Sequence, residues 1–175
     1  EKFCTETYGI RPDDKPSENH FFLYIIPKVI QLHGYGDPLL DKNIGKVVKI
    51  LSDNSFESYF SCTPANINVE KTVEMMEFGL DYLKYSFEST DDVKFKEVRG
   101  NAANFNEAYK KTVEVLSIKE QRGFNTKIII TMIDIGHNEE QREEYRKLRE
   151  VFEGLDVYIY LKSEDQQWYR KDETL

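Results

Sequence analysis

The chain has 175 residues, a formal net charge of −8 and a pI near 5.0, and 39% of its residues are hydrophobic. This length fits one globular domain, and the acidic balance excludes a general nucleic-acid binder, which needs a basic face. No apolar run reaches the ~18 residues of a membrane span, and two cysteines are too few for a disulfide scaffold or a four-cysteine zinc site, so we expect a cytoplasmic protein without membrane attachment.

Apolar or β-branched runs alternate with helical patterns along the chain. In chain order, the expected strands are 28–33, 57–62, 82–87, 127–133 and 156–161. Apolar residues recur at helical spacing over 44–51, 69–80, 105–116 and 145–152. Asn138 and Gln141 predict a capping box at the start of the last helix.

This alternation predicts an α/β fold built from βα repeats. The strands are continuously apolar rather than alternating in polarity, which indicates a parallel sheet covered by helices. The spacing leaves an open doubly wound sheet and an arc of a barrel as alternatives, and both place ligands at the carboxyl ends of the strands. The polar or glycine-rich stretches HGYGD (33–37), TPAN (63–66) and SFEST (86–90) each follow a strand, so they should meet at one edge.

The first of these stretches is a glycine turn that does not fit the common phosphate-binding motifs. A Walker loop ends in Gly-Lys-Ser/Thr, and a dinucleotide fingerprint needs a third glycine where Leu39 stands. Pro38 also lacks a backbone N–H. Two interpretations remain: a turn whose backbone carbonyls approach an ammonium group, or a tight turn in which Asp37 holds local backbone.

Taken in order, four stretches resemble the radical S-adenosylmethionine (SAM) enzymes. LHGYGDPLL resembles the family's GGEP motif, YFSCTPANI and GLDYLKYSFEST resemble the two following strands, and KEVRGNAANFNEAYKKTVEVL resembles the next helix. The resemblance implies a partial (β/α)6 barrel over residues 1–162. It also implies a tail, 163–175, that leads toward a further region such as the cysteine-rich extension of the SPASM-like branch.

In this family a 4Fe-4S cluster and SAM generate a 5′-deoxyadenosyl radical that abstracts a hydrogen atom from the substrate. The resemblance implies that Cys4 ligates the cluster and Phe3 lies near the adenine. It further implies that Ser86 and Arg99 hold the SAM carboxylate and ribose region. The remaining implied SAM contacts are Gly34, Tyr35, Gly36, Asp37, Thr63 and Asn66.

The chain departs from the family at the cluster loop. The CxxxCxΦC pattern requires a cysteine where Glu1 stands, and the second cysteine of this chain, Cys62, lies on an expected strand and is interpreted as a core residue. Two hypotheses therefore stay open: a radical SAM enzyme core whose cluster loop is incomplete here, and a cluster-free, non-catalytic binding scaffold of the same fold.

Partners follow from the same resemblance. It implies a peptide, protein or natural-product substrate and an electron donor such as flavodoxin or ferredoxin. A partial barrel also leaves an apolar inner face exposed, which a partner domain or another segment is expected to cover. His33, beside the glycine turn, is expected to hydrogen-bond at a strand end.

Overall fold

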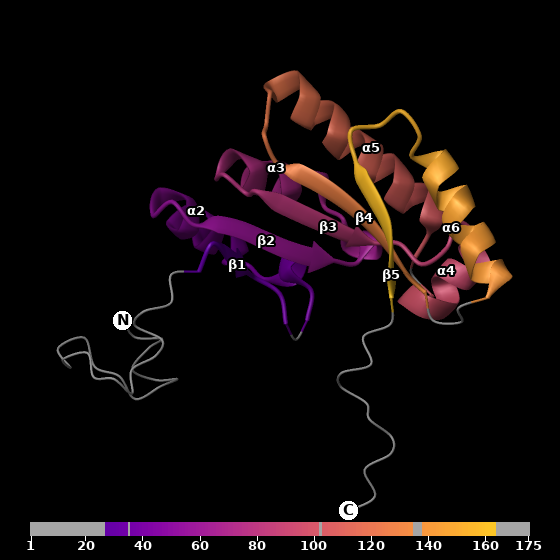
Figure 1. Cartoon of the computed structure of the whole chain (residues 1–175). Coiled ribbons are helices and arrows are strands. Elements are labelled where there is room, and N and C mark those ends of the chain that lie inside the picture. The colour runs from indigo at the N-terminus through magenta and orange to yellow at the C-terminus, as the bar shows by residue number, and fades with distance from the viewer. Residues whose placement is uncertain (1–26, 35, 102, 135–137, 164–175) are drawn as a thin grey trace, which may run out of the picture.

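The computed structural model describes residues 27–34, 36–101, 103–134 and 138–163 (Figure 1). Within them, five parallel strands form one sheet in the order β1-β2-β3-β4-β5. The strands are β1 (Val29–Gln31), β2 (Glu57–Cys62), β3 (Tyr82–Ser86), β4 (Lys127–Asp134) and β5 (Tyr158–Ser163). Each strand therefore pairs with the strand before it in the chain, and this sequential order is that of a barrel arc rather than a doubly wound sheet.

Helices cover one face of this sheet, and Figure 1 shows the other face without a helical layer. Right-handed crossovers between sequential parallel strands place every connecting helix on the same side. The helices are α2 (Ile44–Asp53), α3 (Val69–Glu77), α4 (Asp92–Arg99), α5 (Phe105–Arg122) and α6 (Glu139–Val151), with short 3-10 turns η2 (Pro38–Leu40) and η3 (Pro64–Asn66). The expected α/β fold with a partial barrel is confirmed.

The side-chain alternation of the strands separates a helix-covered convex face from a concave face. Along β3, Leu83 and Tyr85 are fully buried beneath the helices, whereas Lys84 and Ser86 on the opposite face are only partly buried. Phe87 continues the buried side and contacts a group of aromatic rings from α4, α5 and the end of α6. These rings anchor the carboxyl end of β3, which carries several of the predicted site residues.

Four of the predicted strands differ from the structure at their ends, among them β4, which ends at Asp134 rather than at 133. β1 covers 29–31 rather than 28–33, and β3 ends one residue earlier than predicted. β5 covers 158–163 rather than 156–161 because Asp156 is an exposed turn residue paired with Lys119, and the backbone turns again at Val157. The last described strand therefore ends at Ser163.

The segment 92–122 contains two helices where the sequence predicted one. Gly100, with a positive φ of 93°, separates α4 from α5. The Asp91 side chain caps α4 by accepting the N–H groups of Val93 and Lys94. Only Phe95 of α4 is buried, so the helix carries almost no apolar periodicity. Arg99 is the last residue of α4.

The predicted capping box of α6 is half confirmed. The Asn138 side chain accepts the N–H of Gln141, as a helix cap does. The Gln141 amide does not return to Asn138. Instead it donates to the Ile133 carbonyl at 3.1 Å and ties α6 to the end of β4. No helix in the described parts of the chain is long and apolar enough to cross a membrane.

Candidate functional site

The Asp37 carboxylate joins the loops that follow β1 and β2. Its Oδ1 accepts the Leu39 N–H at 2.9 Å and so begins η2. Its Oδ2 accepts the Thr63 N–H at 2.8 Å and the Asn66 side-chain amide at 3.1 Å. The interpretation that Asp37 holds the turn is confirmed, and the turn is fixed to the neighbouring loop as well as within itself. We call these four residues the Asp37 clasp.

The glycines of the turn leave the backbone beside this clasp accessible. Gly36 has a φ of 93°, a region in which residues with a Cβ are strained. A Cβ added at Gly34 or Gly36 would meet no atom within 4 Å, so the space next to both residues is open. Tyr35, between them, lies outside the described residues, as do Phe3 and Cys4. Their predicted roles stay predictions.

Thr63 and Asn66 contribute different groups to the Asp37 clasp. Asn66 donates its side-chain amide to Asp37. Thr63 gives its backbone N–H to Asp37, but its hydroxyl is buried and has no hydrogen-bond partner among the described residues. A buried polar atom without a partner costs about 1–3 kcal/mol. Such an atom at the carboxyl edge of a parallel sheet is available to a ligand.

Next to the clasp, three hydroxyl groups cross the concave face from β2 to β4. The Ser86 Oγ lies 3.3 Å from the Ser61 Oγ and 3.5 Å from the Thr131 Oγ1. The sheet register explains this row, because Ser86 is paired directly with Thr131. The structure thus places the predicted residue Ser86 within a group of hydroxyls, two of which the sequence analysis did not single out.

The structure brings Arg99 to Ser86, but through the Ser86 backbone carbonyl. The Arg99 Nη2 donates to that carbonyl at 2.9 Å and also forms an ion pair with Glu88. The Arg99 Nε is buried without a partner among the described residues. Arg99 and Ser86 are therefore neighbours, and their role in holding SAM stays a prediction.

Glu88 is a residue of this site that the sequence analysis missed. Its side chain is only 7% exposed, and the Ile133 N–H approaches its Oε2 at 3.3 Å. Burial raises the pKa of the Glu88 carboxyl, and the Arg99 guanidinium opposes this rise. The available signal was its place two residues after Ser86, which puts both side chains on one face of an extended segment.

His33 has the strand-end role that the sequence predicted. Its Nδ1 accepts the Ser61 N–H at 3.0 Å, and its Nε2 lies 2.9 Å from the Gln31 amide nitrogen. Desolvation lowers the pKa of His33, and the positive charges of Lys84 and Lys162 lower it further. A neutral imidazole suits the observed acceptor role toward Ser61.

The described residues do not fit an iron–sulfur cluster. Cys62 is 4% exposed on the convex face, where its thiol contacts the Lys84 carbonyl at 3.7 Å, and burial raises its pKa well above the usual value. This confirms the prediction of a core cysteine, since an inert buried thiol cannot ligate at the opposite face. Among the described ranges, no three His, Cys, Asp or Glu side chains are grouped so as to hold a metal ion.

Comparison with known proteins gives matches among solved structures only. No protein-family model and no curated protein matches the sequence. A structure of TYW1 with a bound lysine–pyruvate adduct superposes with a TM-score of 0.57 at 20% identity, covering 85% of this chain and 46% of that chain. Coproporphyrinogen III oxidase (HemN) from Escherichia coli, described as a radical SAM enzyme, gives 0.54 at 14% identity, covering 79% and 32%.

A third solved structure also superposes on this chain. Methylornithine synthase (PylB) gives a TM-score of 0.50 at 13% identity and covers 76% of this chain and 39% of that chain. The chain thus spans less than half the length of each of these structures. At such identities the similarity shows the fold alone. The chain has the partial-barrel fold that a radical SAM enzyme uses.

Proposed function

We propose that this chain is the core of a radical SAM protein and binds SAM at the carboxyl edge of β1, β2 and β3. The Asp37 clasp carries this proposal. It fixes an open glycine turn beside an unpartnered buried hydroxyl, in a fold shared with HemN. Ligands of parallel α/β sheets bind at this edge.

The residues of the site suit the polar end of SAM. The backbone carbonyls of Gly34, Tyr35 and Gly36 are proposed to accept the ammonium group. The Thr63 hydroxyl and Ser86 hydroxyl contact the ribose or carboxylate. Asn66 supports Asp37, to which its amide is already bonded.

Arg99 supplies a positive charge for the SAM carboxylate. Its Nη2 is engaged with Ser86 and Glu88, and its Nε is without a partner among the described residues. The fork of a guanidinium can accommodate one carboxylate on each edge, so the SAM carboxylate approaches from the Nε side. Glu88 then orients Arg99 and does not itself contact SAM.

A 4Fe-4S cluster, when bound, supplies the electron that cleaves SAM and starts hydrogen-atom abstraction. The described residues offer it no thiolate, and Cys4, with Phe3 beside it, is the cysteine of this sequence proposed to serve. Radical chemistry on a peptide, protein or natural product, with an electron donor such as flavodoxin, is therefore proposed for a protein that contains more than these residues.

The second candidate is a cluster-free scaffold that binds a ligand at the same edge. Two residues favour this scaffold. Glu1 stands where the CxxxCxΦC pattern requires a cysteine, and Cys62 faces the convex side. Iron content separates the two candidates. The longest natural form is prepared anaerobically, reconstituted with iron and sulfide, and its iron and visible spectrum are measured. About four irons and an absorption band that responds to SAM support the enzyme, and no iron supports the scaffold.

The SAM site itself is tested with Thr63→Val, which removes the unpartnered hydroxyl and keeps the shape of the side chain. We expect unchanged or higher stability, because a buried unsatisfied group is lost, and about tenfold weaker SAM binding by calorimetry. Thr112→Val is the matched control, since the Thr112 hydroxyl donates to the Ala108 carbonyl on the convex side. It should lower stability and leave SAM binding unchanged. Unchanged SAM affinity in Thr63→Val contradicts the proposed site.

A further inference from the structure

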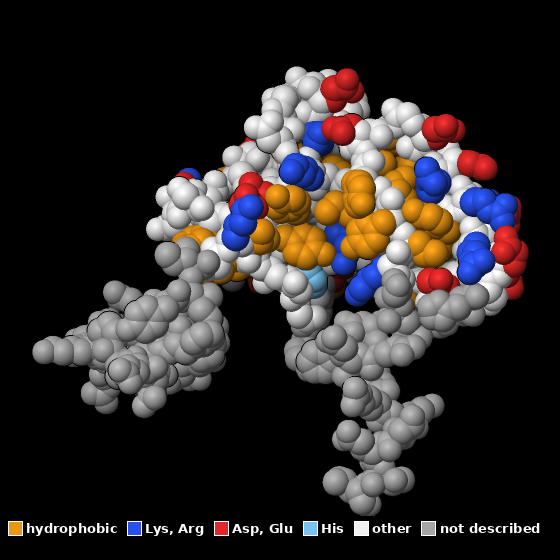
Figure 2. Space-filling model, in the orientation of Figure 1, with side chains coloured by type: hydrophobic (Ala, Val, Ile, Leu, Met, Phe, Trp, Pro, Cys, Tyr) orange, Lys and Arg blue, Asp and Glu red, His pale blue; other side chains and the backbone are white. Residues whose placement is uncertain are grey.

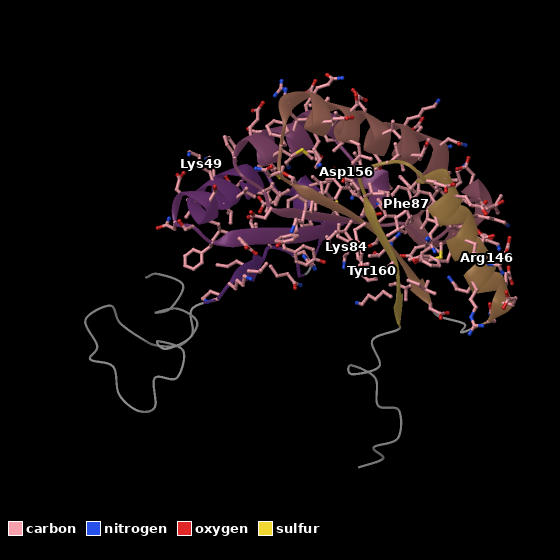
Figure 3. The ribbon with its side chains drawn as sticks, turned by 45° about the horizontal axis from the view of Figure 1, so that its top comes forward. Lys49, Lys84, Phe87, Arg146, Asp156 and Tyr160 are labelled. Carbon is pink, nitrogen blue, oxygen red and sulfur yellow. The ribbon has the colours of Figure 1, made fainter. Side chains whose placement is uncertain are left out.

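The concave face of the sheet carries tyrosines and lysines instead of a helical layer. Figure 2 shows hydrophobic side chains gathered in the middle of this face, with Lys or Arg groups among them and acidic groups mainly toward the edges. Lys84 and Tyr160 lie on this face, opposite to the side on which Phe87 meets the helices (Figure 3). We call Tyr59, Lys84, Tyr160 and Lys162 the tyrosine–lysine face.

Strand register and ring contacts bring these side chains together. Tyr160 is paired with Thr131 of β4, and Lys84 is paired with Ile129 two residues earlier on that strand, so both project from the same side. The Lys84 Nζ lies 5.7 Å from the centre of the Tyr59 ring. Tyr59 and Tyr160 are both partly exposed and offer ring surface beside the ammonium group.

The lysines of this face have no carboxylate partner among the described residues, in a chain whose net charge is −8. The two glutamates of the concave face are engaged elsewhere: Glu57 accepts the Tyr82 hydroxyl and Glu88 pairs with Arg99. Lys162 is paired with Ile133 of β4 and so projects from the same side as Tyr160 and Lys84. The positive charges of both lysines lower the pKa of His33, which follows the edge strand β1.

We propose that Lys84 and Lys162 bind the anionic group of a small organic substrate whose uncharged body packs on Tyr59 and Tyr160. Two lysines without a carboxylate partner among the described residues attract a carboxylate or phosphate, and aromatic rings supply apolar contact at low conformational cost. This site lies below the Asp37 clasp on the inner face, so the inference rests on the proposed function for its role as a substrate site. The binding of an anion there does not depend on SAM.

The test uses a matched pair of probes, 2-naphthoate and the uncharged 2-naphthamide, titrated into the full 15N-labelled chain. We expect 2-naphthoate to bind at least tenfold tighter, with amide shift changes on β3 and β5. Lys84→Met and Lys162→Met should each weaken naphthoate about three- to tenfold and leave naphthamide unchanged. Lys46→Met is the control, since Lys46 is exposed on α2 at the convex side.

The outcomes separate this inference from the proposed function. Equal affinity for the two probes, equal loss in Lys46→Met, or shift changes confined to the convex side overturns the inference. SAM binding is measured on the reconstituted long form of the same variants, in which Lys84→Met should retain it. If naphthoate binding depends on the lysines but SAM does not bind, only the proposed function is refuted. If SAM binds but naphthoate binding does not depend on the lysines, only the present inference is refuted.

Discussion

Replacement of Asp37 tests whether one carboxylate holds the site edge together. Asp37 accepts three hydrogen bonds, from Leu39, Thr63 and Asn66. An asparagine can turn its single carbonyl toward the two donors on the Oδ2 side or toward the one on the Oδ1 side, but not toward both. We therefore expect Asp37→Asn to lower the free energy of unfolding by about 2–3 kcal/mol, and Asp37→Ala by about 4 kcal/mol, because bonds to a charged acceptor contribute about 1.5–3 kcal/mol each.

Urea unfolding followed by circular dichroism measures this loss, and hydrogen exchange at the Thr63 amide locates it. Asp41→Asn is the matched control, because Asp41 is exposed and its carboxylate accepts only the nearby Asn43 N–H among the described residues. It should cost less than about 0.5 kcal/mol. If Asp37→Asn costs no more than Asp41→Asn, or leaves exchange at Thr63 unchanged, the clasp does not stabilise this edge and the reasoning is refuted.

Three further predictions concern the buried charges and the thiol. Arg99→Met should lower the free energy of unfolding by about 2–3 kcal/mol, because Glu88 is left buried and unpaired. Adding Glu88→Gln should recover at least half of that loss in a double-mutant cycle. Strictly additive losses of the two variants contradict the pairing. Because the folded-state pKa of Glu88 is raised above its ordinary value, its contribution to stability is greatest below that value of 4.5 and is lost as pH rises through the raised pKa. The free energy of unfolding of Glu88→Gln relative to wild type should therefore increase from about pH 4 to pH 7. A difference that does not depend on pH argues against a raised pKa. The Cys62 thiol should react with a disulfide reagent at least a hundredfold more slowly in the native than in the urea-unfolded chain, and equal rates would contradict its burial.

The fold could be predicted where the sequence pattern has one physical cause. The strand at 57–62 has the predicted bounds, although its burial alternates instead of being continuous, and the strand predicted at 127–133 extends one residue further to Asp134. The pairing of both follows from the βα order. Asp37 could be predicted as a turn residue because glycine permits the positive φ that a turn needs and Pro38 fixes its own φ. These features depend on residues close in the sequence.

Other parts of the site could not be predicted because they depend on tertiary contacts. α4 buries only Phe95, so its helical period is not visible in the sequence. Glu88 resembles any exposed acid until the ion pair with Arg99 and the approach of Ile133 are known. The positive potential around Lys84 likewise needs the strand register, which places charges from distant segments on one face.

The hydroxyl row of Ser61, Ser86 and Thr131 has a consequence for what the edge of the sheet can recognise. At separations of 3.3 and 3.5 Å these groups are held only weakly to one another, and each hydroxyl hydrogen can rotate. When one of them turns, its neighbour can exchange the role of donor for that of acceptor. The three hydroxyl groups can therefore reorient together. They can donate a hydrogen bond to an oxygen, or accept one from an ammonium or hydroxyl group, without any movement of the backbone.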